Sequence, residues 1–379
     1  MGGQHGEGFR ASMMLCRPRP LRRHLTSCQP VAYVMRIDPD IHSARGLPLD
    51  FYSSPELFDL QRRALLSRSW HFLSPTHLLG PETGAVAPVE FMPGSLDEPV
   101  VLVRGADHNA RCLSNVCSHR AAQVVSGPGV LKQLRCPYHG RCFSLTGEVQ
   151  SAPGFDSPTG DLSEVQLQRM GPFLFAALDP VEPFPLLAPQ LAALPWDDLQ
   201  LDEASSSHWE VAAHWALYVE NYLEGLHIPF VHRALAGALD WKRYRYEQFT
   251  GGTLQVGVAA AGDTAFEGEE RVAAWYLWLF PTTMLNIYPW GVSLNRVLPM
   301  GPMRTRIEFQ SWVWRSDLRE QGAGSGLDTV EREDEAVVEA VQRGVRAARA
   351  RRAEYSPEHE RGVHHFHRII ARYLQDSPP

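Results

Sequence analysis

Two short segments carry the side chains with the clearest metal-binding chemistry. The segment that starts at Cys117 reads CSH and the one that starts at Cys136 reads CPYHG, so each supplies one thiol and one imidazole. Structural zinc sites also use two cysteines and two histidines, but they commonly place both cysteines in one knuckle. The mixed segments favour a [2Fe–2S] cluster in which Cys117 and Cys136 hold one iron, with zinc ligation as the alternative. In such a cluster His119 and His139 hold the other iron.

The backbone of the second segment can turn tightly, because Pro137 and Gly140 flank its central residues. Together the two segments resemble the loops of Rieske [2Fe–2S] proteins. Respiratory members of that family carry an extra cysteine in each loop; the matching positions here are Ala122 and Tyr138, so no disulfide can form there. The resemblance implies a reduction potential near the low end of the Rieske range, on the order of −150 mV. Many oxygenase relatives carry Trp where this chain has Arg141, a difference that concerns packing rather than ligation.

A second group of ligating side chains lies in the segment ENYLEGLHIPFVH, which starts at Glu220. On a helix, Glu220, Glu224 and His227 fall in one stripe, which could simply face solvent. Large apolar residues surround most of this helix, so we expect it to be buried and its carboxylates to need partners or a metal. Pro229 disfavours helical geometry at the preceding residue, so we expect the helix to end there. A turn after Pro229 could bring His227 and His232 onto one ion.

A carboxylate later in the chain can complete this site. Asp334 lies at the centre of an apolar helical stripe, whereas Glu333 and Glu335 lie about 100° to either side, as solvated residues would. The stripe consists of Val337, Val338, Val341 and Val345. A lone aspartate facing a core is costly unless it is paired or binds a cation. Two histidines and one carboxylate form the facial triad of non-haem Fe(II) oxygenases, which leaves positions open for O₂ and substrate.

With both groups in place, the chain resembles the α subunit of Rieske non-haem iron oxygenases of the ring-hydroxylating group. The resemblance rests on the Rieske loops, the E-N-x-x-E-x-x-H-x-x-x-x-H segment and the E-D-x-x-x-x-E-x-V-Q-R-G segment at 333–344, and it covers about residues 50–375. It implies that His227, His232 and Asp334 bind iron. It also implies an α+β fold, in which an antiparallel β Rieske domain precedes a helix-grip (START-like) catalytic domain with a deep apolar pocket. The expected parts are an extension at 1–34, a lead-in at 35–58, the Rieske domain at 59–172 and the catalytic domain at 173–379.

The same resemblance implies how electrons reach the catalytic site. A separate flavin/iron–sulfur reductase that uses NADH or NADPH reduces the Rieske cluster, which passes electrons to a mononuclear Fe(II) that uses O₂ as co-substrate. Family members form head-to-tail homotrimers, in which the cluster of one chain lies beside the iron of its neighbour. A carboxylate three residues before the first iron-binding histidine bridges the two centres. That position is Glu224, and its expected partners are His227 and a neighbouring chain's His139.

The expected substrate is a small organic molecule that is hydroxylated or oxidatively demethylated by mono- or dioxygenation. Many ring-hydroxylating members carry Asp where this chain has Glu224, whereas Glu occurs among relatives that oxidise choline, glycine betaine and carnitine. A quaternary ammonium substrate would require an aromatic cage, and an aromatic substrate would suit the same pocket. The candidate cage residues, which could also be core-facing strand residues, are Trp275, Tyr276, Trp278, Phe280, Tyr288 and Trp290. The alternative from another class is a non-catalytic Rieske electron-transfer protein fused to a hydrophobic-ligand-binding domain.

Composition argues against other function classes. A formal net charge of −7 and a pI near 6.1 argue against a nucleic-acid binder. The longest apolar run, which Pro281 ends, is too short to span a membrane, so a cytoplasmic location is expected. Residues 1–34 are rich in arginine and lack the apolar core of a secretory signal. They could be a transit-like peptide, but we expect them to be a disordered extension, or to precede a true start at Met35.

The elements that must position these residues follow from the hydrophobic pattern. We expect a helix over residues 52–73, short strands over 85–150 and a Pro-rich connector over 178–199. Beyond it we expect a helix over 211–228, strands over 250–315 and a helix over 329–352. The His-rich tail, with His364, His365 and His367, is expected to pack against the protein rather than to bind metal.

Overall fold

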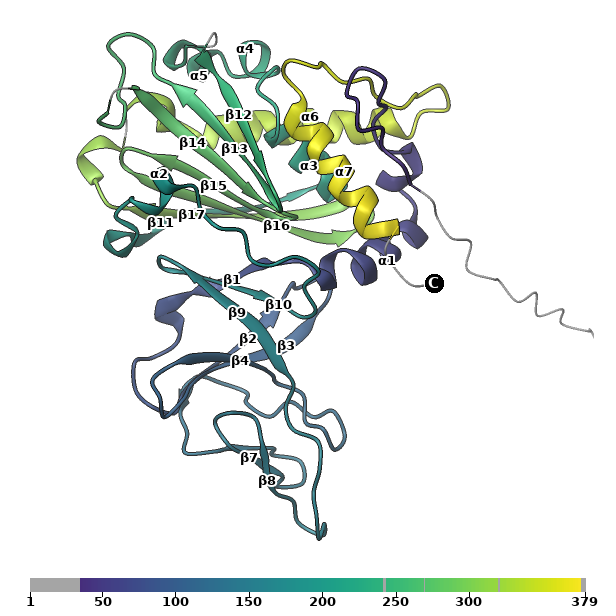
Figure 1. Cartoon of the computed structure of the whole chain (residues 1–379), viewed down its shortest axis with the longest axis vertical. Helices are drawn as coiled ribbons and strands as arrows, with labels where there is room; N and C mark the ends of the chain where they lie inside the picture. Colours follow the sequence, from purple (N-terminus) through teal and green to yellow (C-terminus); the bar gives the residue numbers. More distant parts are fainter. Residues whose placement is uncertain (1–34, 241–242, 269, 320, 376–379) are drawn as a thin grey trace, which may run out of the picture. The chain divides into compact units, whose positions relative to one another are not determined.

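The computed structural model describes residues 35–240, 243–268, 270–319 and 321–375 (Figure 1). The arginine-rich segment at residues 1–34 therefore lies outside the described residues, and its expected disorder stays a prediction. No helix in the described ranges has both the length and the apolar character needed to cross a lipid bilayer. The expected cytoplasmic location likewise stays a prediction.

The first half of the chain forms two antiparallel sheets that carry the CSH and CPYHG loops. A seven-stranded sheet has the order β1-β10-β9-β4-β3-β2-β5, and a three-stranded sheet has the order β6-β7-β8. The strands are β1 (His71–Pro75), β2 (Ala85–Phe91), β3 (Glu98–Arg104), β4 (Ala110–Ser114), β5 (Gly129–Val130), β6 (Leu134–Arg135), β7 (Cys142–Phe143), β8 (Val149–Ser151), β9 (Glu164–Met170) and β10 (Phe173–Ala177). Val101 and Val103 of β3 pack in one core cluster with Cys117 and Cys136, so the loop cysteines are part of the core.

The second half of the chain is built on one large antiparallel sheet. Its strand order is β11-β17-β16-β15-β14-β13-β12. The strands are β11 (Gln200–Val211), β12 (Arg245–Phe249), β13 (Gly252–Val258), β14 (Val272–Leu279), β15 (Thr283–Tyr288), β16 (Gly291–Gly301) and β17 (Arg304–Val313). The antiparallel pairing of both large sheets, with helices added to the second, confirms the expected α+β fold class.

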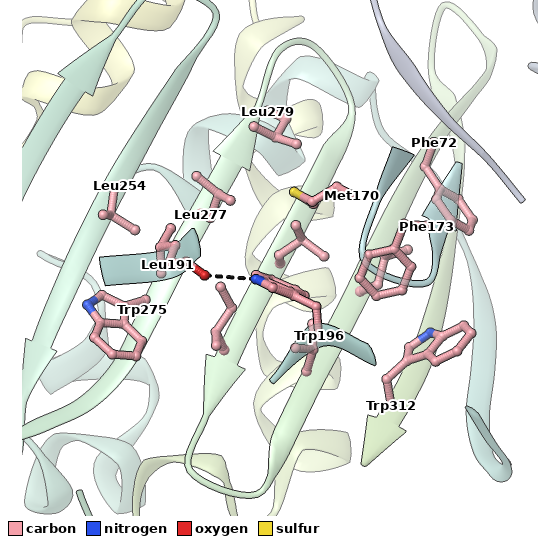
Figure 2. Packing of buried hydrophobic residues seen from close by; sticks show 14 of the residues in the cluster. Phe72, Met170, Phe173, Leu191, Trp196, Leu254, Trp275, Leu277, Leu279 and Trp312 are labelled. Atoms are coloured by element: carbon pink, nitrogen blue, oxygen red, sulfur yellow. Dashed lines mark hydrogen bonds between the residues drawn. The ribbon is translucent and has the colours of Figure 1, made fainter. Parts of the chain in front are cut away.

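The two faces of this second sheet have different roles, because successive side chains along a strand point to opposite sides. On β14, Trp275 and Leu277 join a core cluster that also contains Phe173 of β10 and Trp196 (Figure 2). The Trp196 indole nitrogen donates a hydrogen bond to the Leu191 carbonyl at 2.8 Å within that cluster. The intervening residue of β14, Tyr276, belongs to a different cluster on the opposite face. The opposite face is therefore free to line a site.

Helices cover that opposite face. The α-helices are α1 (Pro55–Ala64), α2 (Pro189–Ala192), α3 (Trp215–Tyr222), α4 (Ile228–Val231), α5 (Arg233–Ala238), α6 (Leu327–Val345) and α7 (Arg361–Gln375), with 3₁₀ turns at Leu49–Tyr52, Leu66–Arg68, Thr76–Leu78, Trp196–Asp198, Ser316–Leu318 and Gly322–Gly324. Phe366 of α7 packs edge-to-face on Trp278 of β14, with ring centroids 5.2 Å apart. Helix α6 follows Gly326, whose φ of 64° favours glycine. Among them α3, α6 and α7 lie over one face of the sheet (Figure 1), whereas Leu191 of α2 packs in the core cluster on the other face.

The structure corrects several expected elements. The helix expected over 52–73 is shorter: Ser54 caps α1, and the chain is already a strand from His71. The helix expected over 211–228 divides into α3 and α4, and the long helix ends at Val345 rather than near 352. Strand β11 and helix α7 were not expected. Strand β10 belongs to the first sheet, while the domain boundary expected at 172 stays a prediction.

Candidate functional site

The two cysteine–histidine loops fold in the same way. In each loop the cysteine carbonyl accepts a hydrogen bond from the amide four residues later, which belongs to Ala121 in one loop and Gly140 in the other. Both of those residues have positive φ, 55° and 74°. Each cysteine amide in turn donates to the carbonyl five residues later, that of Ala122 or Arg141. The loops are thus a matched pair of tight turns, although only one of them has glycine at the left-handed position.

The side chains of these loops separate into buried thiols and accessible imidazoles. Cys117 and Cys136 are buried, whereas His139 is exposed and His119 is partly buried. The two histidine rings lie together, with centroids 4.6 Å apart. Burial, followed by the nearby Cys136 thiol, raises the pKa of Cys117, because two adjacent thiolates repel each other without a cation between them. Paired thiols beneath paired imidazoles fit a [2Fe–2S] cluster with its histidine side outward.

Residues around the outer edge of this group are structural. Arg141 is buried and packs its guanidinium near the rings of Phe143 and Phe155, at 5.8 and 5.9 Å. It also donates a hydrogen bond to the Thr159 carbonyl. Arg141, which stands where many oxygenase relatives have Trp, therefore has a packing role, as expected. Tyr138 is 60% exposed and lies against the His139 ring, and the four described cysteines are free thiols.

The segment after α3 is a turn rather than a continuing helix. Helix α3 ends at Tyr222, and α4 starts at Ile228 with Pro229 at its second position. The prediction that Pro229 ends a helix was therefore wrong, because proline is well suited to the first turn of a new one. The turn is organised by Glu224, whose Oε2 accepts the amides of Leu226 and His227, the latter at 3.1 Å. Its Oε1 lies 2.5 Å from His227 Nδ1.

The structure brings His227, His232 and Asp334 together. Asp334 Oδ1 lies 3.5 Å from His227 Nε2 and 2.9 Å from His232 Nε2. One ligand atom from each residue lies within 4.8 Å of the other two. Within the described ranges, no other group of three or more His, Cys, Asp and Glu side chains has the spacing to hold a single ion. Two imidazole nitrogens and one carboxylate oxygen are a donor set that fits Fe(II).

Both histidines are oriented in the same manner by a glutamate. His227 Nδ1 faces Glu224, and His232 Nδ1 faces Glu333 Oε2 at 2.7 Å. If both Nδ1 atoms carry the proton, both Nε2 atoms are free to bind a metal beside Asp334. Burial of the His232 ring disfavours its charged form, but the hydrogen bonds and charges of Asp334 and Glu333 raise its pKa above the usual value. This excess of negative charge would be balanced by a bound cation.

Helix α6 presents a different face to the core from the one expected. Val338 and Gln342 are buried on it, whereas Val341 is 43% exposed, so the stripe of four valines faces the core only in part. Asp334 still faces inward and accepts a hydrogen bond from Asn221 Nδ2 at 2.6 Å. Glu333, expected to be solvated, instead orients His232. Its position directly before the expected aspartate ligand is the only sequence signal for this role.

A cavity adjoins the three potential metal ligands. Its free space amounts to about 700 Å³, part of it open to solvent. The lining comes from α3, α6 and the helix-covered face of the sheet, and includes Tyr218, Tyr222, Tyr244, Tyr276, Tyr288, Gln255, Asn286, Asn295 and Glu331. Of the expected cage residues only Tyr276 and Tyr288 line it. Trp275 and Trp278 lie in packed cores, because on β14 only every second residue faces the helices and Trp278 is covered by Phe366.

The remaining polar residues near α3 belong to a structural network. Glu220 Oε1 accepts from the Tyr52 hydroxyl at 2.7 Å and lies 3.0 Å from His367 Nε2. His364 and His365 face the backbone carbonyls of Asp38 and Phe249, at 2.7 and 3.1 Å. These contacts support the expected packing role of the His-rich tail.

Comparisons with known proteins agree with this geometry. Residues 83–169 match the model of the Rieske [2Fe-2S] domain, and residues 198–376 match that of the ring hydroxylating alpha subunit (catalytic domain). The carnitine monooxygenase oxygenase subunit of Escherichia coli (strain K12) is 28% identical over 358 residues, 87% of this chain and 94% of the relative. Choline monooxygenase of Spinacia oleracea is 25% identical over 369 residues, 90% of this chain and 82% of the relative.

Solved structures share the fold. A quaternary ammonium Rieske monooxygenase in complex with L-carnitine aligns with a TM-score of 0.66 at 23% identity, covering 90% of this chain and 100% of the other. Naphthalene 1,2-dioxygenase from Rhodococcus sp. aligns with a TM-score of 0.64 at 18% identity, covering 88% of this chain and 95% of the other.

Proposed function

We propose that the substrate of this protein is a small quaternary ammonium compound. The premise is that the chain belongs to the Rieske non-haem iron oxygenases, as their terminal oxygenase α subunit. Oxygenases of this family take electrons from a reductase and act on small molecules with a [2Fe–2S] cluster, a mononuclear iron and O₂. The observation that carries the proposal is the cavity beside His227, His232 and Asp334. Its walls combine tyrosine rings with carboxylates, which suits an organic cation.

The ligand roles are part of the proposal. Cys117, His119, Cys136 and His139 would hold the [2Fe–2S] cluster. His227, His232 and Asp334 would hold the iron, which when bound supplies O₂ activation next to the substrate. Glu224 and Glu333 support this site by accepting the Nδ1 protons of the two histidines, which keeps each Nε2 directed at Asp334.

Glu224 has capacity left for the bridging role. A carboxylate can accept about four hydrogen bonds. Two backbone amides use Oε2 and the His227 ring uses one position on Oε1, so one acceptor position remains. We propose that His139 of a neighbouring copy occupies it. Such an arrangement would link the cluster of one chain to the iron of the next.

Exposed apolar side chains at both centres support a homotrimer. Phe230 is 78% exposed and Leu226 is also exposed, beside the Glu224–His227 turn. Tyr138 and Phe155 are exposed beside the cluster histidines. Exposed apolar side chains that gather near functional groups are typical of interaction surfaces. Covering one patch with the other in a head-to-tail ring would remove both from water.

The test is substrate-dependent O₂ consumption by the purified chain with an NADH- or NADPH-dependent flavin/iron–sulfur reductase. The panel contains choline, glycine betaine and carnitine against benzoate and other aromatic acids. We expect O₂ uptake coupled to formation of an oxidised or demethylated product only with the quaternary amines, and none with Asp334→Ala. Product formed only from aromatic acids would overturn the substrate proposal and favour ring hydroxylation.

Metal content separates the oxygenase from its non-catalytic alternative. A filled cluster and a filled mononuclear site amount to about three irons per chain. A chain that binds only the two irons of its cluster under anaerobic reconstitution would be an electron-transfer protein fused to a ligand-binding domain.

A further inference from the structure

Glu331 of α6 is a carboxylate in the cavity that the site described above does not use. It lies on the cavity wall between Val330 and the turn that carries Asp334. No hydrogen bond or ion pair joins Glu331 to any residue in the described part of the chain. It is partly buried, yet its neighbours leave its carboxylate without a positive partner. A carboxylate in such a position either takes up a proton or pairs with a cation from outside the chain.

The charges around the cavity all have the same sign. Three carboxylates line it, from Glu224, Glu331 and Asp334, and its described lining contains no lysine or arginine. Glu224 is occupied by the turn and His227, and Asp334 by Asn221 and the two histidines. Glu331 is thus the one carboxylate of the lining left to face a ligand. The cavity is electrostatically suited to a cation.

The surroundings of Glu331 strengthen this conclusion. Burial, and then the negative charges of Asp328, Glu335 and Asp334, raise its pKa to about 8. A positive ligand would relieve the same repulsion. Arg319 lines a neighbouring polar cavity together with Glu331, but its guanidinium is already paired with Asp202 and donates to Ser311.

Tyrosine rings complete the environment of this carboxylate. Tyr276 lies 6.2 Å edge-to-face from Tyr288 and 6.5 Å from Tyr244, between ring centroids. The Glu331 charge helps to raise the pKa of the buried Tyr218 and Tyr288, after burial and other nearby groups, so it lies close to both. Tyr276 is more than nine-tenths buried, and its hydroxyl makes no hydrogen bond of normal geometry within the described residues. These rings and one carboxylate can surround a charge that cannot donate hydrogen bonds.

We propose that Glu331 is the counter-charge that selects a cationic substrate, by facing the ammonium group while Tyr218, Tyr276 and Tyr288 contact its methyl groups. The inference rests on the proposed quaternary ammonium function and assigns its charge selectivity to one residue. A carboxylate about 5 Å from a cation, at an effective dielectric constant of about 20, accounts for about 270-fold in affinity. Ionising a carboxyl whose pKa is about 8 costs about tenfold of this at pH 7, so about 10- to 100-fold remains.

The test compares two probes of nearly equal shape, choline and its uncharged carbon analogue 3,3-dimethylbutan-1-ol. Equilibrium binding to the anaerobic, iron-loaded oxygenase is measured by calorimetry for the wild type and Glu331→Gln. We expect the wild type to bind choline at least about tenfold more tightly than the alcohol. Glu331→Gln should lose about 10- to 100-fold in choline affinity while its affinity for the alcohol changes less than about threefold. Glu331→Asp, which keeps the charge, should retain a preference for choline even if Glu331→Gln loads iron poorly.

The matched control is Asp328→Asn, which removes the same charge from an exposed position one turn earlier on α6. It should leave the choline preference within about threefold of the wild type, because exposed charges are screened. Suppose that the wild type prefers choline, but Glu331→Gln keeps that preference or Asp328→Asn loses it to the same extent as Glu331→Gln. The role of Glu331 then fails while the proposed function stands. If the wild type binds the alcohol as well as choline, the quaternary ammonium function itself fails, and this inference fails with it.

Discussion

Replacing Glu333 with alanine is expected to raise the dissociation constant for iron. The size of the increase can be worked out from the surroundings of His232. The ring is 2% exposed, and its Nδ1 lies 2.7 Å from Glu333 Oε2 while its Nε2 faces Asp334. With iron on Nε2, the protonated Nδ1 has Glu333 as its acceptor. In Glu333→Ala that buried N–H loses its partner and the ring loses its orientation.

The size of the effect follows from how far water can replace the lost acceptor. A buried donor left without a partner costs about 1–3 kcal/mol. The Glu333 side chain is 41% exposed, so water can enter the space that it leaves in Glu333→Ala, and the cost falls near the lower end. About 1–1.5 kcal/mol corresponds to about a 5- to 13-fold increase in the iron dissociation constant. Outer partners of metal-binding histidines commonly contribute about 10- to 100-fold, which overlaps this range.

The assay is anaerobic competition for Fe(II) between the protein and a chromogenic chelator. Glu333→Gln separates the hydrogen bond from the charge, because its amide oxygen can still accept from Nδ1. We expect Gln to cost at most about 0.5 kcal/mol, as charge contributions from exposed partners are small. An iron affinity in Glu333→Ala equal to that of the wild type, or a Gln variant as weak as the Ala variant, would refute the reasoning.

Three further outcomes are expected. Glu224→Gln places an amide NH₂ against the donors of its own turn or of His227. Reoxidation of the reduced cluster in single-turnover stopped-flow should therefore slow, while the iron content stays near the wild-type value. An unchanged rate of reoxidation would remove the bridging role. Cys136→Ser should abolish the visible absorbance of the cluster and reduce iron from about three to about one per chain, whereas loss of zinc instead of iron would favour a zinc site. Burial lowers the pKa of His71 from 6.5 to about 3. Its neutral ring therefore contributes to the free energy of unfolding fully above pH 6.5, and this contribution is lost toward pH 3 by about 1.4 kcal/mol per pH unit. His71→Gln should flatten that slope when stability is measured by thermal unfolding.

The parts of the fold that the sequence predicted are those whose local pattern agrees with their environment. Strands β3 and β14 are runs of β-branched and aromatic residues, and both are central strands. Residues His71–Pro75 could not be recognised as a strand, because they follow a helix and pair with Phe173–Ala176 a hundred positions later. Long-range pairing leaves no mark in a short window. Helix α7 was missed because its buried face includes histidines whose partners, such as Asp38 and Glu220, come from distant segments.

The candidate site was predictable in its donors but not in its backbone. Cys117, Cys136, His227 and Asp334 were found from residue types and spacing, because few other roles suit those side chains in those positions. The face of α6 was assigned from valines, yet Gln342 is buried there and bonds the His214 amide at 2.8 Å. Apolar periodicity fails where a buried polar side chain replaces an apolar one. The tyrosines that line the cavity could not be predicted either, because the side of a strand that faces the helices depends on strand register.

The position of the break after α3 changes what residue 224 can tell about substrate. A continuous helix would leave Glu224 free, and its identity as Glu rather than Asp would then be a clue to substrate class. In the structure the carboxylate closes the turn by accepting hydrogen bonds from two backbone amides and the ring of His227, and the Glu side chain is long enough to reach all three. The additional methylene therefore has a local structural reason. Evidence for a cationic substrate comes instead from the cavity, where Glu331 and the tyrosines face the place that a ligand must occupy.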